Sequence, residues 1–194
     1  IEWMRAERAA VGPDVDLSAG YLVVLQHPVT TEYAEARTQV TETLEAASEM
    51  DMPVLWFWPN VDAGADGTSK GIRSFRENKH PKNLHFFKNM ASLDFLRLLY
   101  NSQGIAGNSS VAIRECAFLG VPAVNIGTRQ TGRERGCNVI DVGYNRTDIA
   151  AAIRTHLHNG RFPSDPIYGD GDAGGRMASL LAELSFTTTK QLSY

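Results

Sequence analysis

The sequence predicts an α/β fold in which a doubly wound parallel sheet is covered by helices on both faces. Short apolar runs alternate with stretches of helical composition along the 194 residues, and this alternation is typical of parallel sheets with crossover helices. The apolar runs are continuous and do not alternate in polarity, which indicates strands that are buried on both sides. Polar residues or glycine follow the runs directly, at the points where the strands should end.

Six compact apolar runs predict the strands of this sheet. They lie at 21–26, 53–58, 83–88, 104–107, 122–127 and 138–143. Each is a short apolar run of the kind found in buried strands. The run at 53–58 is closed by Pro59 and Asn60, which are typical of turns.

Helical patterns follow the strands in turn. They lie at 30–50, 68–78, 92–102, 110–120, 146–160 and 173–186. In the first of these the apolar residues recur at helical spacing, and Thr30 or Thr31 is expected to cap it. Ser92 and Thr147 are the expected caps of the helices at 92–102 and 146–160. Gly120 is expected to end the helix at 110–120.

The overall composition is that of an ordinary soluble globular protein, with 43% hydrophobic and 21% charged residues. A net charge of −3 without basic runs argues against a nucleic-acid partner. We expect no membrane association, because no apolar run reaches the roughly 18 residues that a membrane span needs. The two cysteines, Cys116 and Cys137, do not suggest a disulfide scaffold, so a cytoplasmic location is expected. A chain that starts at Ile1 also suggests a fragment.

The segment GNSSVAIRE, from Gly107 to Glu115, carries the strongest functional signal. A helix that begins here would offer free N–H groups to an anion, with Asn108 in the turn, and Gly107 would let a ligand approach the backbone. Ser109 and Ser110 are expected to donate to phosphate oxygens, and Glu115 to accept from a ribose diol. A plain strand-to-helix turn, capped by Ser109, is the alternative interpretation.

Other polar residues follow neighbouring strands and should meet at the same edge of the sheet. His27 is the candidate catalytic residue, either bonding a phosphate oxygen or passing a proton, unless it bonds only backbone. Asn60 or Asp62 is suited to a sugar hydroxyl or a base edge, or to a simple turn. Arg129 is expected to fork onto phosphate oxygens. The loop also contains Arg133 and Arg135, which are interpreted as surface charges.

Six motifs together resemble a known family. In order they are LQHPVTTE, WFWPNVDAG, GNSSVAIRE, PAVNIGTRQTGRE, NVIDV and IYGDGDAGGRMASLL. From about residue 15 to 185 the chain resembles the C-terminal half of the hydrolysing UDP-N-acetylglucosamine 2-epimerases. That group includes the bacterial sialic-acid enzymes and the epimerase half of the animal bifunctional epimerase-kinase.

The resemblance implies a Rossmann-like domain that forms the C-terminal part of a glycosyltransferase B type two-domain fold. Residues 1–20 would then be a linker or helix from the preceding half. Residues 21–160 would form the UDP-binding domain, and 161–194 a crossing loop with a terminal helix. A preceding Rossmann-like half is the expected partner, and the complete protein is expected to be a homo-oligomer.

The resemblance also implies an activity: elimination of UDP from UDP-N-acetylglucosamine, followed by hydration to N-acetylmannosamine. It assigns the substrate-site roles to His27, Asn60, Ser109, Ser110, Glu115 and Arg129. That chemistry requires no metal or redox cofactor. The carboxylates that handle the sugar proton would lie in the preceding half, so this chain alone is expected to be inactive. The alternatives are the nucleotide half of a non-hydrolysing 2-epimerase, a glycosyltransferase, or a non-catalytic nucleotide-binding module.

Overall fold

The computed structural model describes residues 10–11 and 15–185. Their strands form one sheet in the order β1-β4-β3-β2-β5-β6-β7. The strands are β1 (Ala10–Val11), β2 (Leu22–Leu25), β3 (Val54–Phe57), β4 (Leu84–Phe87), β5 (Gly104–Gly107), β6 (Ala123–Ile126) and β7 (Val139–Val142). β2 to β7 pair in parallel, and β1 joins β4 in antiparallel orientation. This order of parallel strands is that of the doubly wound nucleotide-binding folds, so the predicted fold class is confirmed.

The helical elements confirm most of the predicted pattern but differ in detail. They are η1 (Thr30–Glu35), α2 (Ala36–Ser48), α3 (Ala65–Lys79), α4 (Ser92–Asn101), η2 (Ser110–Ala112), α5 (Glu115–Leu119), α6 (Arg146–Asn159) and α7 (Ala173–Glu183). The single helix predicted over 110–120 is wrong, because a 3-10 turn is separated there from the short α5. Arg114 lies between them at φ −97° and ψ −73°, and β-branched Val111 and Ile113 lower the local helix propensity.

The predicted caps are also corrected. The segment 30–50 opens as the 3-10 turn η1, which has no side-chain cap, and α4 begins at Ser92 without one. α6 is capped by Asn145, whose side-chain oxygen accepts from the backbone N–H groups of Thr147 and Asp148 at 2.9 and 3.2 Å. Asparagine two residues before the predicted cap therefore satisfies the free donors of this helix.

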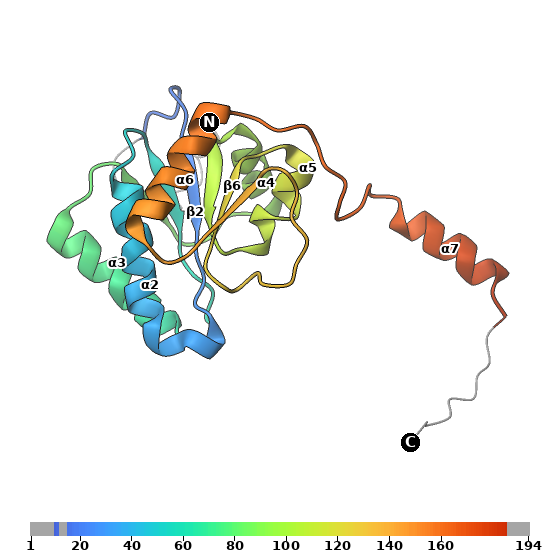
Figure 1. The fold of residues 1–194 in the computed structure, drawn as a ribbon, viewed down its shortest axis with the longest axis horizontal. Coiled ribbons are helices and arrows are strands. Elements are labelled where there is room, and N and C mark those ends of the chain that lie inside the picture. The colour runs from blue at the N-terminus through green and yellow to red at the C-terminus, as the bar shows by residue number, and fades with distance from the viewer. Residues whose placement is uncertain (1–9, 12–14, 186–194) are drawn as a thin grey trace, which may run out of the picture.

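Helices cover both faces of the sheet (Figure 1). On one face Leu44 of α2, Ile72 of α3 and Ile153 of α6 pack with Val24 and Trp56 of the central strands. The opposite face packs against α4 and α5, and its buried side chains include Leu99, Val23, Leu55, Ile105 and Cys116. Burial of this apolar surface on two sides explains why the strands are continuous apolar runs.

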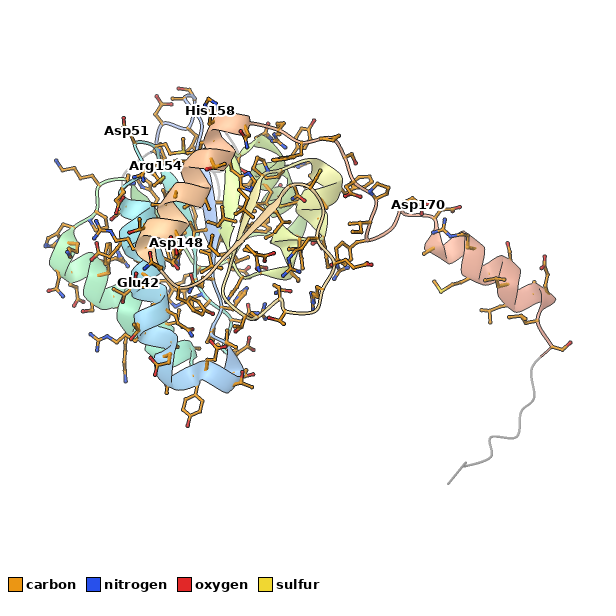
Figure 2. All side chains as sticks on the ribbon, in the orientation of Figure 1. Glu42, Asp51, Asp148, Arg154, His158 and Asp170 are labelled. Atoms are coloured by element: carbon orange, nitrogen blue, oxygen red, sulfur yellow. The ribbon has the colours of Figure 1, made fainter. Side chains whose placement is uncertain are left out.

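The last helix, α7, stands apart from the sheet and from the helices that cover it. Among the described residues of α7 none is buried, and Figures 1 and 2 show the helix and its side chains well away from the sheet. Its large apolar side chains are exposed by 55–61%: Met177, Leu180 and Leu181, with Leu184 just beyond the helix. Within the described ranges no helix has the length and apolar content to cross a membrane.

Candidate functional site

The central feature of the sheet is a switch point between β2 and β5, where the chain changes the side on which it adds strands. In doubly wound sheets this point, at the carboxyl ends of the strands, forms the ligand crevice. A cavity of about 820 Å³ lies there, and its wall includes His27, Asn60, Ser109 and Glu115. These residues follow three different strands, so the fold brings them together from distant parts of the sequence.

The environment of His27 makes its imidazole neutral. Its side chain is buried, and Nδ1 accepts a hydrogen bond from the backbone N–H of Asn60 at 3.1 Å. Burial lowers the pKa of His27 to about 4, with a further contribution from nearby Arg129 and an opposing one from Asp62. A neutral ring that accepts at Nδ1 carries its proton on Nε2. His27 therefore presents a neutral donor.

The end of β5 lies unusually close to the end of β2. Gly107 has φ of 137°, and a Cβ at this position would lie 2.1 Å from the carbonyl oxygen of Leu25. Only glycine fits this backbone and this contact. The next residue, Asn108, is completely buried, and its side chain exchanges two hydrogen bonds with the backbone of His27. The Gly-Asn pair thus has a structural role at the switch point.

Ser109 and Glu115 face the same cavity, but the geometry differs from the predicted one. The Ser109 hydroxyl accepts from the backbone N–H of Val111 at 3.5 Å, which is a weak cap, and Ser110 is half-buried at the start of η2. Glu115 is the first residue of α5 and does not share a continuous helix with the serines. Its Oε2 atom is buried without a hydrogen-bond partner among the described residues, while the side chain forms part of the cavity wall.

Arg129 lies beside this cavity in the loop after β6. Its Nη1 donates to the carbonyl oxygen of Asn108 at 3.2 Å, and its Nη2 lies 4.0 Å from Oδ2 of Asp62. Arg129 and Asp62 also line a second cavity of about 470 Å³, together with Glu32 and Thr128, which are hydrogen-bonded to each other. Asp62 lines both cavities, so they adjoin at this point.

Sequence reasoning missed the residues that support the Arg129 loop. Gln130 is buried, and its side-chain N–H donates to the carbonyl oxygen of Asn108 at 2.7 Å. Arg135, interpreted from the sequence as a surface charge, instead binds both carboxylate oxygens of Asp141 at 3.1 and 3.0 Å. It also donates to the carbonyl oxygen of Gln130 at 3.0 Å. No local pattern reveals the contact of Gln130 with Asn108, because it depends on β5 and β6 being neighbours.

Two further observations concern the reactive side chains of the described residues. Those residues contain no group of three His, Cys, Asp or Glu side chains placed to hold a metal ion. Cys116 is buried, as predicted, and burial raises the pKa of its thiol. It packs as a small apolar side chain on the face covered by α4 and α5.

Comparison with known proteins shows which family this chain matches. Residues 4–182 match the family model described as UDP-N-acetylglucosamine 2-epimerase. A hydrolysing UDP-N,N'-diacetylbacillosamine 2-epimerase from Legionella pneumophila is 31% identical over 159 residues, which are 82% of this chain and 41% of that protein. A UDP-N-acetylglucosamine 2-epimerase from Neisseria meningitidis is 29% identical over 152 residues, 78% of this chain and 39% of that protein. The chain thus spans about two fifths of these relatives.

A solved structure shows the same fold at lower sequence identity. The crystal structure of UDP-GlcNAc 2-epimerase from Neisseria meningitidis, bound to UDP-GlcNAc, superposes with a TM-score of 0.66 at 15% identity. The match covers 86% of this chain and 46% of that one.

Proposed function

Because the chain belongs to the UDP-N-acetylglucosamine 2-epimerase family, we propose that it is the UDP-binding half of a hydrolysing member. The complete protein converts UDP-N-acetylglucosamine and water into N-acetylmannosamine and UDP in the cytoplasm, as a step toward sialic acid or a related nonulosonate sugar. The hydrolysing relative from Legionella pneumophila, at 31% identity, supports this choice within the family.

The observation that carries the proposal is the convergence of His27, Asn60, Ser109 and Glu115 on one cavity at the switch point. A nucleoside diphosphate matches this set of groups. The Nε2–H of His27, the Ser109 hydroxyl and the guanidinium of neighbouring Arg129 are donors for phosphate oxygens. The Glu115 carboxylate, which lines the same cavity, is the acceptor for the ribose hydroxyls. Asn60 is exposed at the mouth of the cavity and is assigned to the same ligand.

These donors would assist departure of the nucleotide. In the proposed reaction the bond between C1 and the UDP oxygen breaks with its electrons going to UDP, while a proton leaves C2. Water then adds across the resulting double bond to give N-acetylmannosamine. Fixed donors that face the diphosphate stabilise the negative charge it gains in the transition state. The neutral His27 serves here as a hydrogen-bond donor to the leaving group.

Other parts of the reaction are assigned to a longer protein. We propose that the group taking the C2 proton lies in a second Rossmann-like half, which precedes residues 21–160 and is joined to them by 1–20. Residues 161–194 would cross back to that half, and the exposed apolar side chains of α7 support this proposal. Ser110 completes the proposed UDP loop, whose backbone Gly107 and Asn108 hold in place. The full-length protein is expected to form a homo-oligomer.

Calorimetric titration of this 194-residue chain with UDP, ADP and uridine tests the proposal. We expect UDP to bind more tightly than ADP or uridine, and Glu115→Ala to weaken UDP by about tenfold through loss of a charge-assisted ribose contact. Glu77→Ala, on the exposed side of α3, is the matched control and should bind UDP like the wild type. Failure of UDP to bind, or equal binding by Glu115→Ala, would contradict the proposal.

Product analysis of the full-length protein distinguishes the alternatives. Free N-acetylmannosamine and UDP indicate the hydrolysing reaction. An epimerised UDP-sugar indicates a non-hydrolysing epimerase, and a new glycoside indicates a glycosyltransferase. A full-length protein that binds UDP but leaves UDP-N-acetylglucosamine unchanged would be a binding module.

A further inference from the structure

Asn108 connects the two central loops of the switch point through both arms of its side chain. Its Oδ1 accepts from the backbone N–H of His27 at 2.7 Å, and its Nδ2 donates to the backbone carbonyl of His27 at 2.8 Å. The two residues are 81 positions apart in the sequence. This reciprocal pair fixes the backbone of His27 relative to the end of β5.

The backbone of Asn108 makes a second connection. Its carbonyl oxygen accepts from the side chain of Gln130 at 2.7 Å and from Nη1 of Arg129 at 3.2 Å. The ring of His27 is held in turn by the backbone N–H of Asn60 at 3.1 Å. One residue therefore links the loops that follow β2, β5 and β6, and the ring of His27 extends the link to the loop after β3.

These contacts leave the Asn108 side chain little capacity for a ligand. The side chain is 0% exposed, and both its oxygen and its nitrogen are already used by His27. We infer that Asn108 is a positioning residue, which sets the placement of His27 and Arg129 for a diphosphate and does not touch the ligand itself. This inference rests on the proposed function, because it assigns the two positioned side chains to the diphosphate of UDP.

The inference predicts a loss that is selective for the diphosphate. Asn108→Ala removes both bonds to His27, so we expect UDP affinity to fall by about tenfold or more, while uridine affinity changes by less than about twofold. A general loosening of the domain would weaken both ligands alike. The ratio of UDP to uridine affinity, measured by calorimetry on the same 194-residue chain, separates the two effects.

A second measurement needs no ligand. Histidine nitrogen NMR of the wild type near neutral pH should show His27 protonated at Nε2 and unprotonated at Nδ1, because Nδ1 accepts from Asn60. Asn108→Ala frees the backbone of His27, so its ring should shift away from the Asn60 N–H and exchange between the two tautomers. This readout stays informative even if UDP proves not to be the ligand.

Two further variants complete the design. Asn138→Ala is the matched control, since Asn138 is also a buried asparagine whose Nδ2 donates to a backbone carbonyl, that of Val121 at 2.9 Å. It lies at the opposite end of the strands, so it should lower stability without changing the affinity ratio or the His27 tautomer. If Asn108→Ala does not fold, Gln130→Met is the second variant. It removes one donor to the Asn108 carbonyl, and the Oε1 atom lost with it has no hydrogen-bond partner among the described residues. It should lower the affinity ratio severalfold.

The outcomes separate this inference from the proposed function. If the wild type does not prefer UDP over uridine, the proposed function fails, and with it the role assigned to the diphosphate. If the wild type prefers UDP but the variants weaken UDP and uridine equally, Asn108 is merely structural. An unchanged His27 tautomer in Asn108→Ala would likewise overturn the positioning role.

Discussion

The guanidinium of Arg129 faces the carboxylate of Asp62, with Nη2 4.0 Å from Oδ2, at the point where the two cavities adjoin. Both side chains are part-exposed, by 29% and 41%. An acidic group beside an anion-binding arginine competes with the ligand for the positive charge. We therefore expect the Asp62 carboxylate to hold the Arg129 guanidinium in the ligand-free protein and to be replaced there by a phosphate of the bound ligand.

Asp62→Asn should tighten UDP binding by about two- to fivefold, which is the scale of a part-exposed ion pair. The gain should shrink as salt concentration rises, because screening weakens the competing charge. Calorimetry at low and high salt measures both effects. Asp66→Asn is the control, since Asp66 is exposed in the first turn of α3. Weaker UDP binding by Asp62→Asn would show that this carboxylate contacts the ligand favourably.

The depressed pKa of His27 should make stability depend on pH. In the unfolded chain its pKa is near 6.5, and in the folded protein it is about 4. As pH falls through this window the unfolded chain takes up a proton that the folded chain does not. The free energy of unfolding should therefore drop by about 3 kcal/mol between pH 6.5 and pH 4 and level off below.

Urea denaturation across this pH range tests the His27 contribution. In His27→Gln the drop should be smaller by about 3 kcal/mol, although part-buried His85 and buried His156 keep their own contributions. His158→Gln, on the exposed side of α6, should retain the wild-type profile. Equal pH profiles for His27→Gln and the wild type would mean that folding leaves the pKa of His27 unchanged.

Gly107→Ala should be severely destabilising. The new Cβ would lie 2.1 Å from the Leu25 carbonyl oxygen, at a φ of 137° that disfavours side chains. We expect a loss of at least about 3 kcal/mol in the free energy of unfolding, or no soluble protein. Gly143→Ala is the control because a Cβ there meets no heavy atom of the described structure within 4 Å, and its change should stay within about 0.5 kcal/mol. Comparable stabilities for the two variants would rule out this close approach.

Arg135→Lys should loosen the loop that carries Arg129. An ammonium group cannot reproduce the two-oxygen contact with Asp141 together with the bond to the Gln130 carbonyl. We expect a loss of about 1–2 kcal/mol in stability and faster hydrogen exchange over residues 128–136. Arg133→Lys is the control, because among the described hydrogen bonds the Arg133 side chain takes no part. Unchanged exchange in Arg135→Lys would show that Arg135 does not hold this loop.

Some of these features could be predicted from local pattern. The apolar runs located every parallel strand, and the short run at 104–107 matches β5 residue for residue. Polar residues after the strands located the cavity wall, including His27 and Glu115. The helix over 110–120 was wrong, because composition alone does not reveal the break at Arg114 between η2 and α5.

The sequence by itself determined the class of fold and the family, since strand runs, helical periods and ordered motifs are local properties of the chain. The tertiary structure alone decided which side chains meet. Asn108 reaches His27, and Asn125 reaches Asp141, only because β5 lies beside β2 and β6 beside β7. Strand order is set by the burial of apolar surface over the whole domain, and no single segment encodes it.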